Sequence, residues 1–146
     1  MAAFSFAVLI SGNGSNLQAM IDAIEKENIS GKICCVLSNK ANVYGLERAD
    51  RAKIPTEVIN NKDFETREDF DTEMVKVLSA YKPDLIVLAG FMRILSPKFI
   101  NAFTGKILNI HPSLLPKYPG LNTHERVLES SDKIHGITVH FVDESL

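Results

Sequence analysis

Short apolar segments alternate with segments of helical periodicity along the chain, and this alternation limits the possible folds more than any other feature of the sequence. Strands that alternate with helices form parallel sheets covered by helices on both faces. The 146 residues therefore predict one α/β domain over 1–146 with an open, doubly wound, mostly parallel sheet, because a TIM barrel needs far more chain. The predicted strands are residues 4–10, 32–37, 56–59, 85–89, 107–110 and 137–141.

The segments between the strands carry apolar residues at spacings of three and four, which is typical of one helix face. In the first, Leu17, Met20 and Ile21 share a face, and Ser15 and Gln18 have the spacing of a capping box. Further helices are predicted around residues 46–49, 70–81, 97–103 and 123–130.

The composition excludes several classes of protein. Apolar residues make up 45% and charged residues 23% of the chain, which argues against disorder. A net charge of −2 gives no bulk attraction to nucleic acid or to an anionic membrane. The longest uncharged apolar run, residues 85–92, is too short to span a bilayer. No basic residue precedes the first apolar stretch, so no signal peptide is predicted and a cytoplasmic location is expected.

Neither the cysteines nor the histidines have the spacing of a metal site. Cys34 and Cys35 are neighbours, and in a regular strand their side chains would point to opposite faces. Their spacing fits neither a disulfide framework nor a zinc site, so two buried thiols are expected. All four histidines lie between positions 111 and 140 at spacings that match no common metal motif. We therefore expect no metal.

The loop after the first strand, residues 11–16, reads Ser-Gly-Asn-Gly-Ser-Asn and leads into a helix. Glycines that permit a tight turn, followed by the free N–H groups of a helix start, can bind phosphate. A plain turn between strand and helix is the alternative. A dinucleotide site is disfavoured, because Leu17 replaces the third glycine of that fingerprint and no acid follows the second strand at Ser38 and Asn39.

Two later loops also follow predicted strands. Residues 90–95 place apolar side chains around Arg93, which suits a flat ligand with a polar edge, or else a core segment with a snorkelling arginine. Residues 109–120 contain three of the six prolines, so this loop is predicted to be rigid. Asn109 and His111 stand two apart, on one side of an extended segment. Such a pair can stabilise an oxyanion and move a proton, unless the histidine is only structural.

These motifs resemble the phosphoribosylglycinamide formyltransferase family, which uses folate in purine synthesis, over essentially the whole chain. The matching segments are residues 11–18, 38–40, 89–95 and 109–120. The resemblance implies a Rossmann-like formyltransferase fold and transfer of a formyl group from 10-formyltetrahydrofolate, as co-substrate, to the amine of glycinamide ribonucleotide. These two small molecules are the implied partners, and the oligomeric state is left open.

The resemblance also implies roles for individual residues. Gly14, Ser15 and Asn16 would hold the ribonucleotide phosphate, in agreement with the loop chemistry. Asn109 would polarise the formyl oxygen and His111 would be the general acid. The residues implied in folate binding are Arg67, Met92, Arg93, Ile94, Leu95 and Asn109.

One departure from the family pattern concerns the end of the sequence. The family has a catalytic aspartate after its last matched strand, and by register this aspartate would be the residue after Leu146. The family's final strand and C-terminal helix would follow it. Two rival interpretations therefore stay open: a module that only binds ligands, and a sister enzyme such as methionyl-tRNA formyltransferase or formyltetrahydrofolate hydrolase.

We expect the 146-residue chain to show little or no turnover, and a version extended past Leu146 to be active. Loss of a carboxylate beside His111 lowers the pKa expected for its imidazolium and so weakens the proposed acid. The measurement is release of deformylated folate from 10-formyltetrahydrofolate and glycinamide ribonucleotide. Equal rates for the two versions would contradict this expectation.

Overall fold

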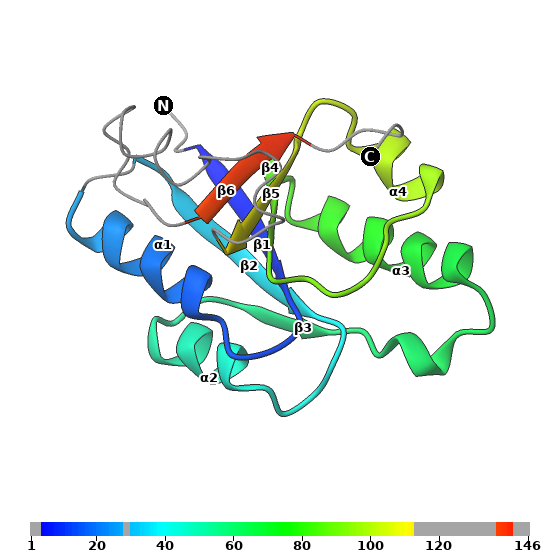
Figure 1. Ribbon diagram of the computed structural model, residues 1–146, viewed down its shortest axis with the longest axis horizontal. Coiled ribbons are helices and arrows are strands. Elements are labelled where there is room, and N and C mark those ends of the chain that lie inside the picture. The colour runs from blue at the N-terminus through cyan, green and yellow to red at the C-terminus, as the bar shows by residue number, and fades with distance from the viewer. Residues whose placement is uncertain (1–3, 28–29, 113–136, 142–146) are drawn as a thin grey trace.

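The computed structural model describes residues 4–27, 30–112 and 137–141. A six-stranded sheet in the order β3-β2-β1-β4-β5-β6 forms the centre, with helices on both faces (Figure 1). The strands are β1 (Ser5–Ile10), β2 (Lys32–Ser38), β3 (Thr56–Val58), β4 (Leu85–Ala89), β5 (Ile107–Pro112) and β6 (Ile137–Phe141). The helices found in the described residues are α1 (Ser15–Glu25), α2 (Tyr44–Arg51), α3 (Arg67–Ala80), α4 (Pro97–Ala102) and the short 3₁₀ helix η1 (Asn61–Asp63).

The predicted open, mostly parallel α/β sheet is confirmed. Strands β1 to β5 pair in parallel, and β6 pairs antiparallel with β5. Predicted and observed strands agree to within one or two residues, and the largest difference is at β5, which continues to Pro112 because His111 and Pro112 pair with Thr138 and Ile137 of β6. The helix predicted over residues 123–130 lies outside the described residues.

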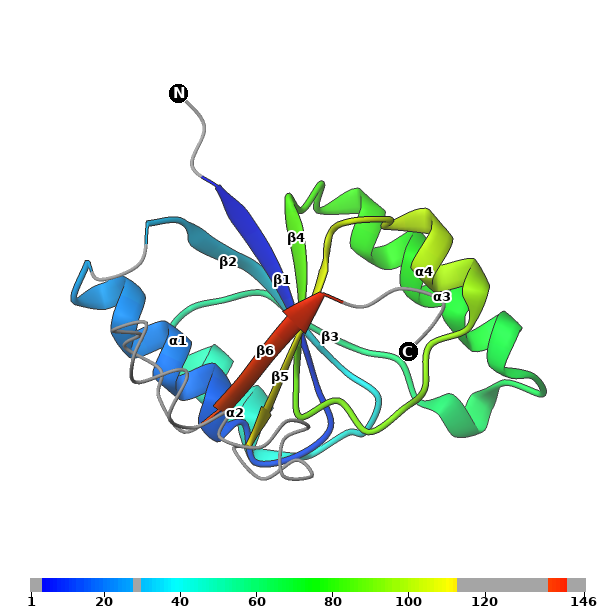
Figure 2. The same cartoon turned by 45° about the horizontal axis from the view of Figure 1, so that its top comes forward.

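The order of the strands reverses direction at β1. From β1 the chain builds β2 and β3 outward on one side, then returns to place β4 and β5 on the other. Helices α1 and α2 cover one face of the sheet, and α3 and α4 cover the other (Figures 1 and 2). In open sheets of this kind, the loops after the two strands at the reversal diverge and leave a crevice between them. Here those loops follow β1 and β4.

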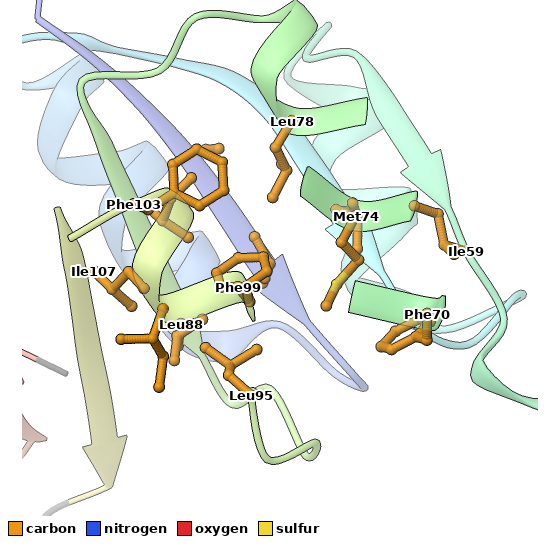
Figure 3. Close-up of a cluster of buried hydrophobic side chains, with 14 of the residues drawn as sticks. Ile59, Phe70, Met74, Leu78, Leu88, Leu95, Phe99, Phe103 and Ile107 are labelled. Atoms are coloured by element: carbon orange, nitrogen blue, oxygen red, sulfur yellow. The ribbon is translucent and has the colours of Figure 1, made fainter. Parts of the chain in front are cut away.

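Two hydrophobic clusters hold the helices to the sheet. Strand β4 serves both, since Ile86 and Leu88 face the α3–α4 side whereas Val87 and Ala89 face the α1–α2 side. Figure 3 shows the first cluster, in which side chains from α3 and α4 meet those of the strands. Phe99 of α4 is completely buried there, and burial of one such side chain contributes about 1.5–3 kcal/mol.

The predicted capping box at the start of α1 is wrong. Ser15 is the first residue of the helix, and Gly14, at φ 79° in the left-handed region, occupies the N-cap position. Gln18 instead donates from Nε2 to Asp22, 2.9 Å away and one turn further along. Glycine adopts this backbone conformation without steric cost, and the first amide groups of α1 are left without a capping side chain from the described residues.

The expectation that Cys34 and Cys35 face opposite sides of the sheet is also wrong. The β1–β2 register pairs Phe6 with Ile33 and Ala7 with Cys35, so Cys34 is an extra residue in a β-bulge. A bulge interrupts the alternation of side chains. Both thiols consequently pack on the α3–α4 side, and a hydrogen bond with Cys35 lowers the pKa of Cys34 to about 7, against the opposing effect of burial.

We predict that alkylation of Cys34 by iodoacetamide has its midpoint near pH 7. A pKa of about 7 means that roughly half of the Cys34 thiol is already the reactive thiolate at neutral pH. Cys35→Ala removes the hydrogen-bond donor and should raise the midpoint toward that of an ordinary thiol, whereas Cys35→Ser keeps a donor and should raise it less. Mass spectrometry of the Cys34 peptide gives the rates. A midpoint that does not move in Cys35→Ala would refute the cause assigned here.

Candidate functional site

A cavity of about 260 Å³ lies between the loops that follow β1 and β4. Residues 11–16 line one side, and Ala89, Gly90 and Met92 line the other. The cavity is therefore at the reversal of strand order, where the carboxyl ends of two parallel strands meet. The structure thus brings together the first predicted loop and the beginning of the second.

The loop after β1 brings the start of α1 to this cavity. Gly14, Ser15 and Asn16 all line it, and α1 begins at Ser15. The amides of a first helical turn have no partner within the helix, and the helix dipole adds partial positive charge at the same end. An anion such as a phosphate group fits this chemistry.

Gly14 lies against Gly45 of α2, with almost no space between the two backbones. A Cβ atom added to Gly14 would lie 2.7 Å from the Gly45 Cα atom. The Gly45 amide also donates to the Gly12 carbonyl oxygen over 3.0 Å. In contrast, a Cβ atom on Gly12 would meet nothing within 4 Å. Of the two glycines in the predicted loop, only Gly14 is therefore required by the backbone, and Gly45 is a partner that the sequence motif did not reveal.

Arg48 of α2 holds the other side of the same loop. Its Nε atom donates to the Asn13 carbonyl oxygen over 2.7 Å, and Nη2 donates to Asn13 Oδ1 over 2.6 Å. The guanidinium group also lies 4.6 Å from the centre of the Tyr44 ring. Sequence reasoning missed this residue, because Arg48 and Asn13 are far apart in the chain and α2 carries no motif that links them.

The loop after β4 is fixed at its ends and exposed between them. The Met92 amide donates to Ser11 Oγ over 2.7 Å, and the Ser96 amide donates to the buried carboxylate of Asp71 over 2.7 Å. In the segment from Met92 to Ser96, Met92 and Ile94 are 75% and 71% exposed. Two apolar side chains held in solvent beside a cavity suit contact with a flat, partly apolar ligand.

The remaining residues implied in folate binding are placed differently. Leu95 is buried in the α3–α4 cluster. The guanidinium group of Arg93 lies 5.8 Å from the centre of the Phe70 ring of α3, so its side chain packs along the protein as the core alternative predicted. Arg67 is exposed at the first position of α3. None of these three residues lines the cavity itself.

Asn109 and His111 both belong to β5, next to β4. Asn109 pairs with Leu88 on β4 and with His140 on β6, and its side chain is partly buried. The carboxyl end of β5 lies at the same edge of the sheet as the cavity, because β4 and β5 are parallel. For His111 the structure gives the strand position, and its predicted catalytic role stays a prediction.

Within residues 4–27, 30–112 and 137–141, no group of three or more His, Cys, Asp or Glu side chains could hold a metal ion. His124 and His135 lie outside this part of the chain. No helix in the same residues is long and apolar enough to cross a membrane.

Comparison with known proteins identifies the family. The formyl transferase family model matches residues 4–146. The phosphoribosylglycinamide formyltransferase of Escherichia coli strain K12 is 54% identical over 142 residues, which are 97% of this chain and 67% of that protein. The chain belongs to the formyl transferase family, among the phosphoribosylglycinamide formyltransferases.

Further relatives agree with this assignment. The trifunctional purine biosynthetic protein adenosine-3 of Homo sapiens is 54% identical over 140 residues, which cover 96% of this chain and 14% of that protein. The solved structure of the phosphoribosylglycinamide formyltransferase from Coxiella burnetii matches with a TM-score of 0.79 and 51% identity, over 97% of this chain and 66% of that one. This member of the formyl transferase family thus spans about two thirds of the length of its bacterial relatives.

We predict that Gly45→Ala destabilises the protein by about 1–3 kcal/mol, the usual cost of overpacking. The added Cβ atom would lie 2.4 Å from Ile10 Cδ1 and 2.9 Å from the Gly12 carbonyl oxygen, which is backbone and cannot rotate away. Gly12→Ala is the matched control, since its Cβ atom has open space. Urea unfolding measures both variants, and equal stability would contradict the close approach.

Proposed function

We propose that the protein transfers a formyl group from 10-formyltetrahydrofolate to the amine of glycinamide ribonucleotide. The observation that carries this proposal is the shared cavity, in which an anion-binding loop and the loop after β4 face each other. Two substrates bound in these loops would meet at the carboxyl edge of β4 and β5. The membership of the family supports the choice of substrates.

The acceptor would be held by its phosphate group. In this proposal the phosphate binds the amides of Gly14, Ser15 and Asn16, with the dipole of α1 directed at it. Arg48 keeps the loop in shape through Asn13 and adds positive charge nearby. The glycine amine would then extend along the edge of the sheet toward β5.

The folate would lie against residues 92–95. Exposed Met92 and Ile94 offer apolar contact to the pterin ring, and the backbone between them offers hydrogen-bonding groups to its polar edge. Because the Arg93 guanidinium group packs over Phe70, we propose that Arg93 contributes through its backbone. The exposed Arg67 at the start of α3 would contact the folate away from the formyl group.

The chemistry would be direct acyl transfer. The amine attacks the formyl carbon, a new C–N bond forms, and the formyl oxygen becomes an oxyanion. Asn109 would donate a hydrogen bond to that oxygen, and His111 would give a proton to the folate nitrogen as its bond to carbon breaks, while the amine loses one proton. Bringing two substrates together in this way can supply up to roughly 10 kcal/mol, and a donor aimed at the oxyanion adds to it.

We also propose a cytoplasmic location for the reaction. Two relatives that are 56% and 54% identical to this chain are purine-biosynthetic proteins by name. Fractionation of cells that express the tagged protein would measure this.

Formyl transfer by the 146-residue chain and by the version extended past Leu146 tests the proposal. From the extended version we expect deformylated folate to be released with glycinamide ribonucleotide and not with aminoacyl-tRNA or water alone. In the version extended past Leu146, His111→Asn should lower kcat by about 10²- to 10⁴-fold. Asn109→Leu should lower it by about 10²- to 10³-fold. Transfer to tRNA or water would favour a sister enzyme. Binding of both ligands without transfer in either version would favour a module that only binds.

A further inference from the structure

A chain of hydrogen bonds, one buried and two partly buried, crosses the carboxyl ends of four neighbouring strands. Ser11 follows β1, Asn39 follows β2, Asn61 follows β3, and Met92 follows β4. Ser11 Oγ accepts from the Met92 amide over 2.7 Å and donates to Asn39 Oδ1 over 2.5 Å. Asn39 Nδ2 donates to Asn61 Oδ1 over 3.0 Å. We call these four residues the Ser11 relay.

The relay has a single direction and one central member. Every proton is donated away from Met92, toward Asn39 and then Asn61. Ser11 alone must accept one bond and donate another through the same atom, which a hydroxyl can do. Ser11 is 5% exposed and Asn39 is 1% exposed, so water competes little with the hydrogen bond between them. Loss of the hydroxyl would leave partners unsatisfied.

The bond to Met92 joins the two loops of the site. Ser11 and Met92 both line the cavity, and they belong to the two different loops around it. Packing on the α3–α4 cluster holds Phe91 and Leu95 of this loop, but Met92 and Ile94 are mostly exposed and have little packing to hold them. The hydrogen bond from the Met92 amide to Ser11 therefore fixes the separation of the loop after β4 from the phosphate loop.

We propose that Ser11 is a positioning residue that sets the distance between the two bound substrates. This inference rests on the proposed function, because the loops matter together only if each holds one substrate. Ser11 acts through the Met92 amide and not on the reacting atoms. Displacement of one substrate by about 1 Å can lower the rate by up to roughly 10²-fold. Loss of the Ser11 hydroxyl should therefore lower kcat more than it weakens the binding of either substrate.

The test uses the substitution Ser11→Ala in the version of the protein that extends past Leu146. We expect kcat to fall roughly 10- to 100-fold, while the Kd for each substrate alone changes by less than about 3-fold. Hydrogen exchange of the Met92 amide should become about 10-fold faster. Ser11→Thr keeps a hydroxyl that accepts and donates, and it should recover most of the lost rate.

Ser38→Ala is the matched control. Ser38 is also a buried serine at the carboxyl end of a strand, but among the described residues its hydroxyl bonds only to the backbone of Lys40, within its own turn. The Ser38→Ala variant should be less stable than the unsubstituted protein, but its kcat and the hydrogen-exchange rate of its Met92 amide should stay the same. If Ser11→Ala does not fold, Ser11→Cys keeps the shape with a much weaker hydrogen-bonding group, and the same changes are expected.

Two results would overturn the inference: kcat within about 2-fold of the unsubstituted protein in Ser11→Ala, or an equal loss of kcat in Ser38→Ala. Failure of the proposed function is distinguishable, because the version extended past Leu146, without any substitution, would then show no formyl transfer at all. In that case the exchange rate of the Met92 amide would still report whether Ser11 holds the loop.

Discussion

The parallel pairing of β1 with both β2 and β4 is the constraint on which the rest of the structure depends. All six residues of β1 are buried, and helices cover the strand from both faces. Two parallel strands can be joined only by a crossover connection, which here contains a helix. Because β2 and β4 lie on opposite sides of β1, the connections on the two sides of β1 run in opposite directions along the sheet. The cavity between the loops after β1 and β4 is a consequence of this pairing.

Close contact between backbones then gives the cavity its shape. Gly14 and Gly45 allow the start of α2 to touch the loop after β1, and Arg48 reaches from the next turn of α2 to Asn13. On the other side, Ser11 and Asp71 hold the amides of Met92 and Ser96. The loops that would hold the two substrates are thus fixed by groups that need not touch either one.

The sequence predicted the sheet well because the strands are buried on both faces and read as uninterrupted apolar segments, as at residues 85–89. It was less reliable where a neighbouring strand decides the outcome. β5 extends to Pro112 through its pairing with β6, and the bulge at Cys34 comes from the register between β1 and β2. Ser15 had the right spacing for a capping box, yet the left-handed turn at Gly14 moves the helix start by one residue.

For the site, the chemical groups can be read from local patterns in the sequence: a loop rich in glycine before a helix, an apolar segment around Arg93, and an amide and an imidazole two residues apart at 109 and 111. Which of these groups face one cavity, and what holds them there, depends on how the strands and helices pack together. The links from Arg48 to Asn13, and from Met92 through Ser11 to Asn39, join residues far apart in the chain. Local patterns carry no information on such contacts, because they form only when the strands pair.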